Sequence, residues 1–476
     1  MKKIGFKALS VMLAMTMLFS LVQVSVAAAN VTDYTITNPY KEVTSLLGNM
    51  DKHYKTNLHT HSTYSDAEID LNAMVKGHYN QDFDVLAMAE HGIIGVEWNK
   101  APNYHPLYAY NYALLNDQSH LSDTEFEQIV KGTYRTDLTT RENKRGMECV
   151  TGAIEANMLV MQKNHVNGYF CSNNIGDVEH FLGNEGDFET AVQKIEDCGG
   201  LSHINHPGDW LGSASDAVVL DEDGNPLLDV NGEPMTRGYQ IATDPKNVEF
   251  FAKILRKHPS CLGIEVYNSY DRPTSGDRIL WDSLLKASIP EGRNVWGFAN
   301  NDAHYYEDIG TAFMDYVMPE YSMANLRNAM TKGHFFAVSR YESGERIGNT
   351  KEYPQVTSIL VEDKDGSDKI TIISKNTDSI KWIADGKTIQ ETTVSSNGIV
   401  ISTITLQEHS DDISCYVRAE LQGEGGKTLT QAFVADDGNM EDLITRGPSA
   451  TAPVDFITVL RSLLKMLIRT FTSIFQ

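Results

Sequence analysis

Histidines and carboxylates follow several apolar, strand-like runs between residues 56 and 304. The pieces, in chain order, are His59-Thr60-His61 with Asp66, Glu90-His91, Glu148, His165, His206-Pro207, and Asp302-Ala303-His304. If these runs are the strands of an α/β barrel, their carboxyl ends converge on one face. The sequence therefore predicts that these side chains share a single pocket.

These residue types are suited to binding divalent cations. His59 and His61 point the same way if the chain is extended, because side chains two residues apart lie on one face of a strand. Carboxylates packed together repel one another and take up protons unless a cation neutralises them. Imidazole and carboxylate ligands without thiolates are typical of Zn, Mn or Fe. We therefore expect a metal site built from these side chains.

The order of these pieces resembles the PHP (polymerase and histidinol phosphatase) domain family. The resemblance covers about residues 55–340 and rests on six motifs: His59-Thr60-His61 through Asp66, Phe83 to His91, Gly146-Met147-Glu148, Asn164-His165-Val166, Asn205-His206-Pro207, and Asn301-Asp302-Ala303-His304. It implies a distorted (β/α)7 barrel of PHP type, a trinuclear metal centre of Zn, Mn or Fe, and phosphoester hydrolysis.

The same resemblance implies a ligand set. One metal takes His59, His61, Glu148 and Asp302, a second shares Glu148 and adds His165 and His206, and a third takes Asp66, His91 and His304. The family usually has Asp where this chain has Glu90, and His180 competes with His165 for its role. His203 is expected to point to the other face of its strand and to pack in the core.

The implied reaction is hydrolysis by metal-activated water, with Asp302 or His304 assisting proton transfer to the leaving group. Phosphate binding usually also needs a cationic side chain, and the candidates are Arg141, Arg145, Arg237 and Arg272. The sequence does not select among them. The Tyr-rich insertion 95–145 is a candidate lid, or simply surface packing, and a second insertion spans residues 208–245.

The elements that must position these residues alternate between strand and helix. Strands are expected at residues 84–89, 200–205, 261–267 and 295–299, and helices at 189–197 and 247–257. Because the strand runs are continuously apolar, parallel strands covered on both faces are expected. This pattern predicts an α/β barrel or an open sheet, and the family resemblance implies that it is a barrel domain over residues 30–350.

After residue 350, short alternating strands replace this pattern. They are expected near residues 357–360, 370–374, 380–384, 399–406 and 414–421, and they predict an immunoglobulin-like β-sandwich over residues 351–440. Residues 441–476 read as a linker followed by a cationic amphipathic helix. That helix is expected either to contact a membrane or cell surface, or to dock on the protein itself.

The first 29 residues read as a secretory signal peptide. Lys2, Lys3 and Lys7 precede an apolar stretch, and Ala27-Ala28-Ala29 offers a cleavage site before Asn30. We therefore expect a secreted, extracellular protein that is either free or associated with the cell surface. The five cysteines are few and odd in number, so the chain is not a disulfide scaffold.

The chain of 476 residues carries 64 acidic against 40 basic side chains, for a formal net charge of −24. Because nucleic-acid binding usually needs a basic surface, the sequence predicts no nucleic-acid partner and a small-molecule or cell-surface phosphoester substrate instead. Two other functions stay open. One is a metal-dependent carbamate or amide hydrolase on the same barrel, and the other is a non-catalytic surface-binding protein.

Overall fold

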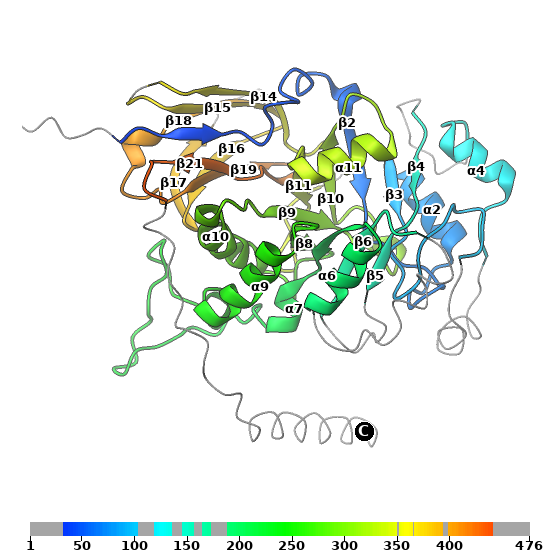
Figure 1. Ribbon diagram of the computed structural model, residues 1–476, viewed down its shortest axis with the longest axis horizontal. Coiled ribbons are helices and arrows are strands. Elements are labelled where there is room, and N and C mark those ends of the chain that lie inside the picture. The colour runs from blue at the N-terminus through cyan, green and yellow to red at the C-terminus, as the bar shows by residue number, and fades with distance from the viewer. Residues whose placement is uncertain are drawn as a thin grey trace, which may run out of the picture.

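The structure is a computed structural model, and it describes residues 32–102, 119–135, 145–156, 164–172, 188–349, 352–364, 366–393 and 398–440. The predicted signal peptide, the C-terminal helix, His180 and Arg141 lie outside these residues. Within them, helices and strands form one mixed α/β structure (Figure 1). No helix in the described part of the chain is both long and apolar enough to cross a membrane.

Two sheets surround the predicted site residues. One contains β2 (His53–Asn57), β3 (Val85–Ala87), β4 (Glu148–Val150), β10 (Ala312–Val317) and β11 (Phe335–Ser339). The other has the order β5 (Ile154–Ala156), β6 (Val166–Tyr169), β7 (Leu201–Ile204), β8 (Cys261–Asn268) and β9 (Trp296–Asn300). The strands expected at 84–89, 200–205, 261–267 and 295–299 are therefore confirmed in position.

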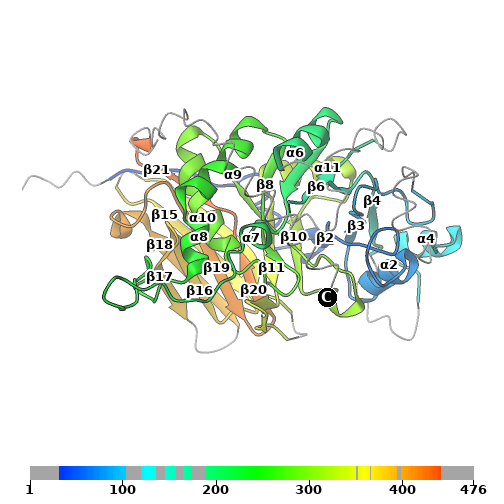
Figure 2. The same cartoon turned by 90° about the horizontal axis from the view of Figure 1, so that it is seen from below.

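The helices cover the outer faces of these sheets (Figures 1 and 2). They are α2 (Leu71–Asn80), α4 (Asp123–Val130), α6 (Phe188–Asp197), α7 (Pro207–Leu211), α8 (Arg237–Ala242), α9 (Pro245–Lys257), α10 (Asp277–Ser288) and α11 (Met323–Lys332). Each of α6 and α9 buries one apolar stripe against the second sheet, and both match the predicted helices.

The strand ladders of the described residues do not close into a barrel. β2, β3 and β4 pair in parallel, as do β7, β8 and β9, but β6 pairs antiparallel with both of its neighbours. The two sheets meet through isolated parallel bridges, Thr60 with Ala303 and His91 with Glu155. The predicted closed barrel is thus not confirmed, and the antiparallel β6 interrupts the parallel arrangement.

The C-terminal strands form two layers. β14 (Gln355–Glu362), β15 (Lys369–Lys375) and β18 (Ile399–Thr405) make one sheet. It faces β16 (Ser379–Ala384), β17 (Lys387–Thr393), β19 (Tyr416–Gly423), β20 (Gly426–Leu429) and β21 (Phe433–Asp436). Apolar side chains from both layers, including Ile372 and Trp382, share one buried core. The strands predicted after residue 350 are therefore present.

The predicted immunoglobulin-like module is not confirmed as a separate one. The second layer continues through β20 into β11 of the sheet that carries the site, and β1 (Thr35–Thr37) pairs with β21. Tyr40 extends this connection, because its hydroxyl donates to the carbonyl of Phe335 and accepts from the backbone N–H of Gln431. The sequence pattern marks strands but does not show which strands pair across 300 or more residues.

Candidate metal centre

The predicted site residues meet at one edge of the two sheets. His59 and His61 follow β2, His91 follows β3, and His206 follows β7 directly. Asp302 and His304 follow β9. Since β2 and β3 run parallel, as do β7 and β9 with β8 between them, their carboxyl ends bring these side chains together.

His165 reaches the same edge by a different route. It directly precedes β6, and β6 runs antiparallel to β7. The start of β6 therefore lies beside the end of β7, where the backbone N–H of Asn205 donates to the carbonyl of His165 at 3.1 Å. The reversed strand places a ligand-type residue at its amino end instead of its carboxyl end.

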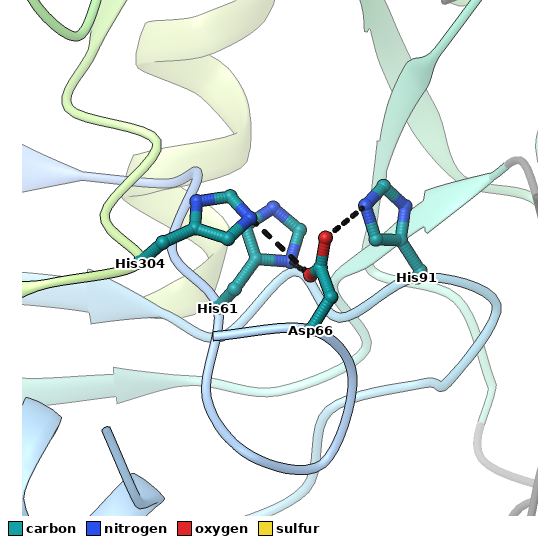
Figure 3. Close-up of side chains that lie close together, drawn as sticks. All are labelled: His61, Asp66, His91 and His304. Carbon is teal, nitrogen blue, oxygen red and sulfur yellow. Dashed lines mark ion pairs between the residues drawn. The ribbon is translucent and has the colours of Figure 1, made fainter. Parts of the chain in front are cut away.

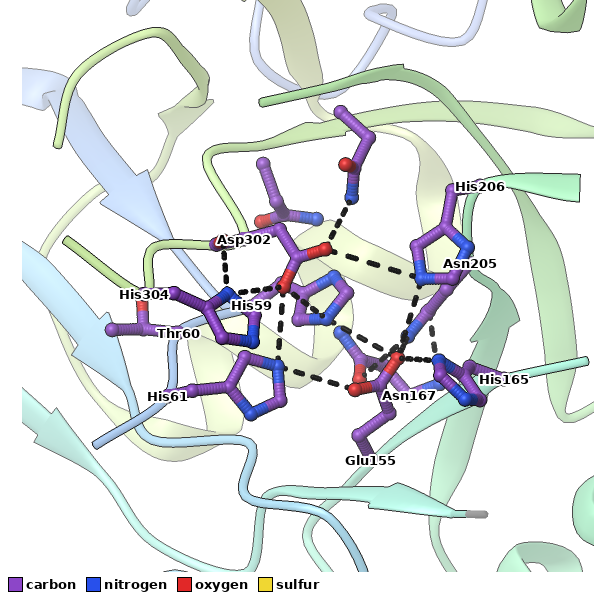
Figure 4. A network of polar contacts seen from close by, with 12 residues as sticks. His59, Thr60, His61, Glu155, His165, Asn167, Asn205, His206, Asp302 and His304 are labelled. Atoms are coloured by element: carbon purple, nitrogen blue, oxygen red, sulfur yellow. Dashed lines mark hydrogen bonds and ion pairs between the residues drawn. The ribbon is translucent and has the colours of Figure 1, made fainter. Parts of the chain in front are cut away.

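A buried carboxylate that the sequence analysis missed lies at the centre of the site. Glu155, in β5, is 1% exposed and faces five imidazoles. Figure 4 shows it beside His59, His61, His165 and His206. Its Oε1 lies 3.0 Å from His165 Nδ1, 3.3 Å from His59 Nε2 and 3.5 Å from His206 Nε2, and its Oε2 lies 3.2 Å from both His61 Nε2 and His91 Nδ1. Asn205 also donates to Oε1 at 2.7 Å.

Glu148, predicted as the bridging ligand, does not join this cluster. In the parallel pairing of β3 and β4 it lies opposite Val85, the residue that begins β3. The cluster instead lies beyond the other end of β3, where His91 pairs with Glu155. The position predicted for Glu148 is thus wrong, and Glu155 stands there. A Glu enclosed by Ile154 and Ala156 in a strand-like run was the available signal.

Four of the predicted residues form what we call the outer group: His61, Asp66, His91 and His304 (Figure 3). The carboxylate of Asp66 lies between two rings, 3.2 Å from His304 Nε2 and 3.5 Å from His91 Nε2. His61 Nδ1 is 3.7 Å from the same carboxylate. Asp66 and His304 keep side-chain exposures of 19% and 27%, so this group faces solvent.

Glu90 holds the loop that carries Asp66. Its completely enclosed carboxylate accepts hydrogen bonds from the backbone N–H of Ser62 at 3.0 Å and from the hydroxyls of Ser62 and Ser65, each at 2.5 Å. His61 is farther away, with Nδ1 4.0 Å from the Glu90 carboxylate. The structure therefore gives the residue that departs from the family pattern a role in fixing this loop.

His59, His206 and Asp302 form a second set, which we call the inner group. Asp302 Oδ1 lies 3.2 Å from His59 Nε2, and Asp302 Oδ2 lies 4.0 Å from His206 Nε2. Both His206 and Asp302 have positive φ, 26° and 45°. Such backbone conformations cost about 1–3 kcal/mol and occur where surrounding contacts enforce them, often at functional sites.

The buried histidines and carboxylates of the cluster shift one another's pKa values. Burial by itself lowers the pKa of His59, but Asp302 and Glu155 outweigh it and raise that pKa well above its usual value. Burial similarly opposes ionisation of Asp302, yet His59 and His61 hold its pKa well below the ordinary range. The carboxylates thus remain ionised and require positive charge beside them.

The donor atoms fit divalent cations. His59 Nε2, His61 Nε2 and Asp302 Oδ1 are buried and make no hydrogen bond to any described residue. His59 Nδ1 and His61 Nδ1 do have partners, Glu265 at 2.9 Å and Ser65 at 3.2 Å, which leaves Nε2 of each ring directed at the carboxylates. A divalent cation would supply the missing partner for these buried ring nitrogens. The hydrogen bond at the other nitrogen fixes each ring for such binding.

Other predicted residues lie elsewhere. His203 is completely buried and stacks on Phe298, with ring centroids 4.3 Å apart, as expected for a core histidine. Arg145 binds the backbone carbonyls of Asp51 and His53, at the amino end of β2, so it is remote from the cluster. Arg237 bonds to Gln240 on the surface.

No family model matches the sequence, and no curated protein matches it. Among solved structures, the chain is similar to a two-domain protein from Bacteroides vulgatus that contains a predicted PHP-like metal-dependent phosphoesterase, at 14% identity over 80% of this chain and 95% of that chain (TM-score 0.38). It is also similar to a lesion-specific endonuclease from Pyrococcus furiosus, at 11% identity over 59% and 56% (TM-score 0.29).

A further similar structure is Endonuclease Q in complex with a 27-mer duplex that carries an abasic lesion, at 13% identity over 58% of this chain and 56% of that chain (TM-score 0.28). This finding contradicts the prediction of no nucleic-acid partner. That prediction used the net charge of the whole chain, whereas binding depends on the local field, which bound cations invert. Net charge therefore does not exclude this class of partner.

Proposed function

We propose that this protein is a metal-dependent hydrolase that cleaves phosphoesters with three divalent cations, Zn, Mn or Fe. The observation that carries the proposal is the convergence of nine ligand-type side chains, six of them histidines, on one edge of the fold: His59, His61, Asp66, His91, Glu155, His165, His206, Asp302 and His304. The outer group supports one cation position. The two oxygens of Glu155 face different rings, which supports positions on either side of it.

Divalent cations supply a lowered pKa for water and a positive field for developing charge on a phosphoryl group. The residues of the chain do the rest. Glu155 carries negative charge that attracts the cations, the histidines offer neutral ring nitrogens as ligands, and Asn205 fixes the Glu155 carboxylate through its side-chain amide. Asp302 and His304, with side-chain exposures of 17% and 27%, are both accessible to solvent and are the candidates for proton transfer to the leaving group.

The first test is a substrate panel assayed with added Mn²⁺ or Zn²⁺: nitrophenyl phosphomonoesters, phosphodiesters, carboxyl esters and carbamates. We expect turnover of a phosphoester and its loss, by several orders of magnitude, in the Asp302→Ala variant. Turnover of carbamates or carboxyl esters alone would transfer the assignment to an amide or carbamate hydrolase. Absence of metal-dependent turnover on every class would favour the non-catalytic alternative.

We propose export as well, on the basis of the signal-peptide pattern in residues 1–29. The mature chain is then expected to begin at Asn30. N-terminal sequencing of the exported protein checks this, and a mature chain that still carries Lys2 would contradict it.

A further inference from the structure

A second buried carboxylate, Glu265, lies behind the candidate metal centre and was not among the predicted site residues. It is in the middle of β8, and its side chain has no exposed surface. An ionised carboxylate in such a position is costly unless hydrogen bonds satisfy both of its oxygens. The partners of Glu265 therefore indicate why it is tolerated there.

Four donors converge on this carboxylate. Its Oε1 accepts from His59 Nδ1 at 2.9 Å and from the side-chain amide of Asn300 at 2.8 Å. Its Oε2 accepts from the side-chain amide of Asn268 at 3.0 Å and from the backbone N–H of His206 at 3.1 Å. Because an ionised carboxylate only accepts, His59 carries its proton on Nδ1 and presents Nε2 to the candidate centre.

These contacts reach all three members of the inner group. Glu265 binds the ring of His59 and the backbone of His206 directly. Asn268 extends the network, because its amide also lies 3.3 Å from Asp302 Oδ2. His206 and Asp302 are the two residues of the group that have positive φ, so the network holds the backbone where it is strained.

The outer group is fixed by different residues. His61 Nδ1 contacts Ser65 and Asp66, and Glu90 fixes the loop between them. His304 Nδ1 lies 2.9 Å from the carbonyl oxygen of Asp302, and its backbone N–H donates to Asp308. Among the described residues, Glu265 makes no hydrogen bond or ion pair with any member of the outer group.

We propose that Glu265 is a positioning residue that orients the inner group for one cation and leaves the outer group unaffected. The inference rests on the proposed metal-dependent function. A carboxylate that binds the second nitrogen of a ligand histidine fixes the ring and increases its basicity, and loss of such a partner typically weakens metal affinity about 10–100-fold. We expect this loss at one cation position only.

The Glu265→Gln variant tests the proposal, because it keeps the shape of the side chain and removes the charge. Metal-free protein is titrated with Mn²⁺ or Zn²⁺ by equilibrium dialysis with elemental analysis. We expect one cation to bind about 10–100-fold more weakly than in the wild type, and the others to bind unchanged. Asp66→Asn is expected to weaken a different cation, so the double variant should show both losses.

Asp315→Asn is the matched control. Asp315 and His53 also form a buried carboxylate–imidazole pair, with Oδ2 and Nδ1 2.8 Å apart, on a part of β2 and β10 remote from the cluster. Urea unfolding of the metal-free proteins measures how much each substitution lowers the free energy of unfolding. We expect both variants to be destabilised and Glu265→Gln alone to lose cation affinity.

The outcomes separate the two proposals. If the wild type binds no divalent cation tightly, the proposed function fails. If the wild type binds cations and Glu265→Gln binds them equally well, or loses all of them, the selective role of Glu265 is wrong and the function stands. An equal loss of cation affinity in Asp315→Asn would show that general destabilisation of the fold, and not the position of Glu265, weakens cation binding. If Glu265→Gln does not fold, Asn268→Ala keeps the Glu265 carboxylate, removes the amide that joins it to Asp302, and should weaken the same cation.

Discussion

At the scale of single residues, His78 links α2 to the strand ends below the candidate centre. It is completely buried, its Nδ1 donates to the carbonyl of Met74 at 3.0 Å, and its Nε2 accepts from the amide of Asn301 at 2.9 Å. Burial lowers the pKa of His78 to about 4. The folded protein thus keeps this ring neutral under mildly acidic conditions.

This pKa predicts acid sensitivity. Between pH of about 6.5 and about 4 the unfolded state binds a proton at His78 that the folded state does not, so stability falls as the pH falls through this window. The contribution is roughly 3 kcal/mol, at 1.36 kcal/mol per pKa unit. Urea unfolding at a series of pH values should show a shallower pH dependence in His78→Gln. The exposed His120 supplies the control His120→Gln, and an unchanged dependence in both variants would contradict the prediction.

Residue types and order were enough to predict most of the candidate site. Eight of the nine metal-ligand candidates come together, and the exception, Glu148, is seven positions from the carboxylate that replaces it. Two glutamates near the same strand-like run are equivalent in a pattern of residue types. Only the register of β3 against β4 and the bridge from His91 to Glu155 show which one reaches the site. Glu265 was missed for a related reason, because its partners are far away in sequence.

At the scale of elements, α10 and β19 are joined by a buried ion pair. Arg418 of β19 donates to both oxygens of Asp282 of α10, with both distances 2.7 Å, and Tyr416 donates to the same carboxylate at 2.8 Å. The Arg418 guanidinium also lies over the ring of Trp281, 5.0 Å from its centroid. Both charges are almost fully buried. Arg418 also pairs with Glu420 at 2.7 Å, so removal of Asp282 would leave the guanidinium with one carboxylate partner in place of two.

We expect Asp282→Ala to destabilise the protein by about 3–5 kcal/mol, since it leaves Arg418 buried without its main partner. Lys286→Ala is the control on the same helix, because Lys286 pairs with Asp385 at a half-exposed surface position, 3.0 Å apart. A surface pair of this kind contributes less than about 1 kcal/mol. Chemical denaturation measures the free energy of unfolding of both variants. Similar decreases in Asp282→Ala and Lys286→Ala would show that the buried pair contributes no more than the surface pair.

The elements themselves were easier to predict than their pairing. A strand that is buried on both faces has a continuous apolar run, as in β7, β8 and β9, and a strand that is buried on one face alternates apolar and polar residues, as in β19. These strands can therefore be predicted from local sequence. The local pattern of apolar residues does not determine whether a strand runs parallel or antiparallel to its neighbour. β6 runs against β7 through contacts between backbones, and the sequence around His165 carries no sign of the reversal.

At the scale of the whole molecule, the C-terminal layers and the site-bearing sheets are one structure. β20 pairs with β11, β1 pairs with β21, and buried residues of α10, β9 and β19 belong to a common apolar core. The boundary predicted near residue 350 separates two sequence patterns. Strand pairs and buried apolar contacts extend across this boundary.

We therefore expect the full chain to unfold in one cooperative transition, and a fragment that ends at residue 350 to be unable to fold stably. The fragment would expose the edge of β11 and the apolar face of α10, which favours aggregation. Urea denaturation followed by tryptophan fluorescence and by circular dichroism measures this. Two separate transitions, or a monomeric and cooperatively folded fragment, would show that the two parts are independent domains.

The central claim is that Glu155 lies between the cations of a polynuclear centre. The most direct measurement is the metal content of three proteins, dialysed in parallel against Mn²⁺ or Zn²⁺ and analysed for metal per chain. The wild type and Glu148→Gln are predicted to hold the same number of tightly bound cations, at least two, whereas Glu155→Gln is predicted to lose two together. Fewer than two cations in the wild type, or an unchanged content in Glu155→Gln, would contradict the account.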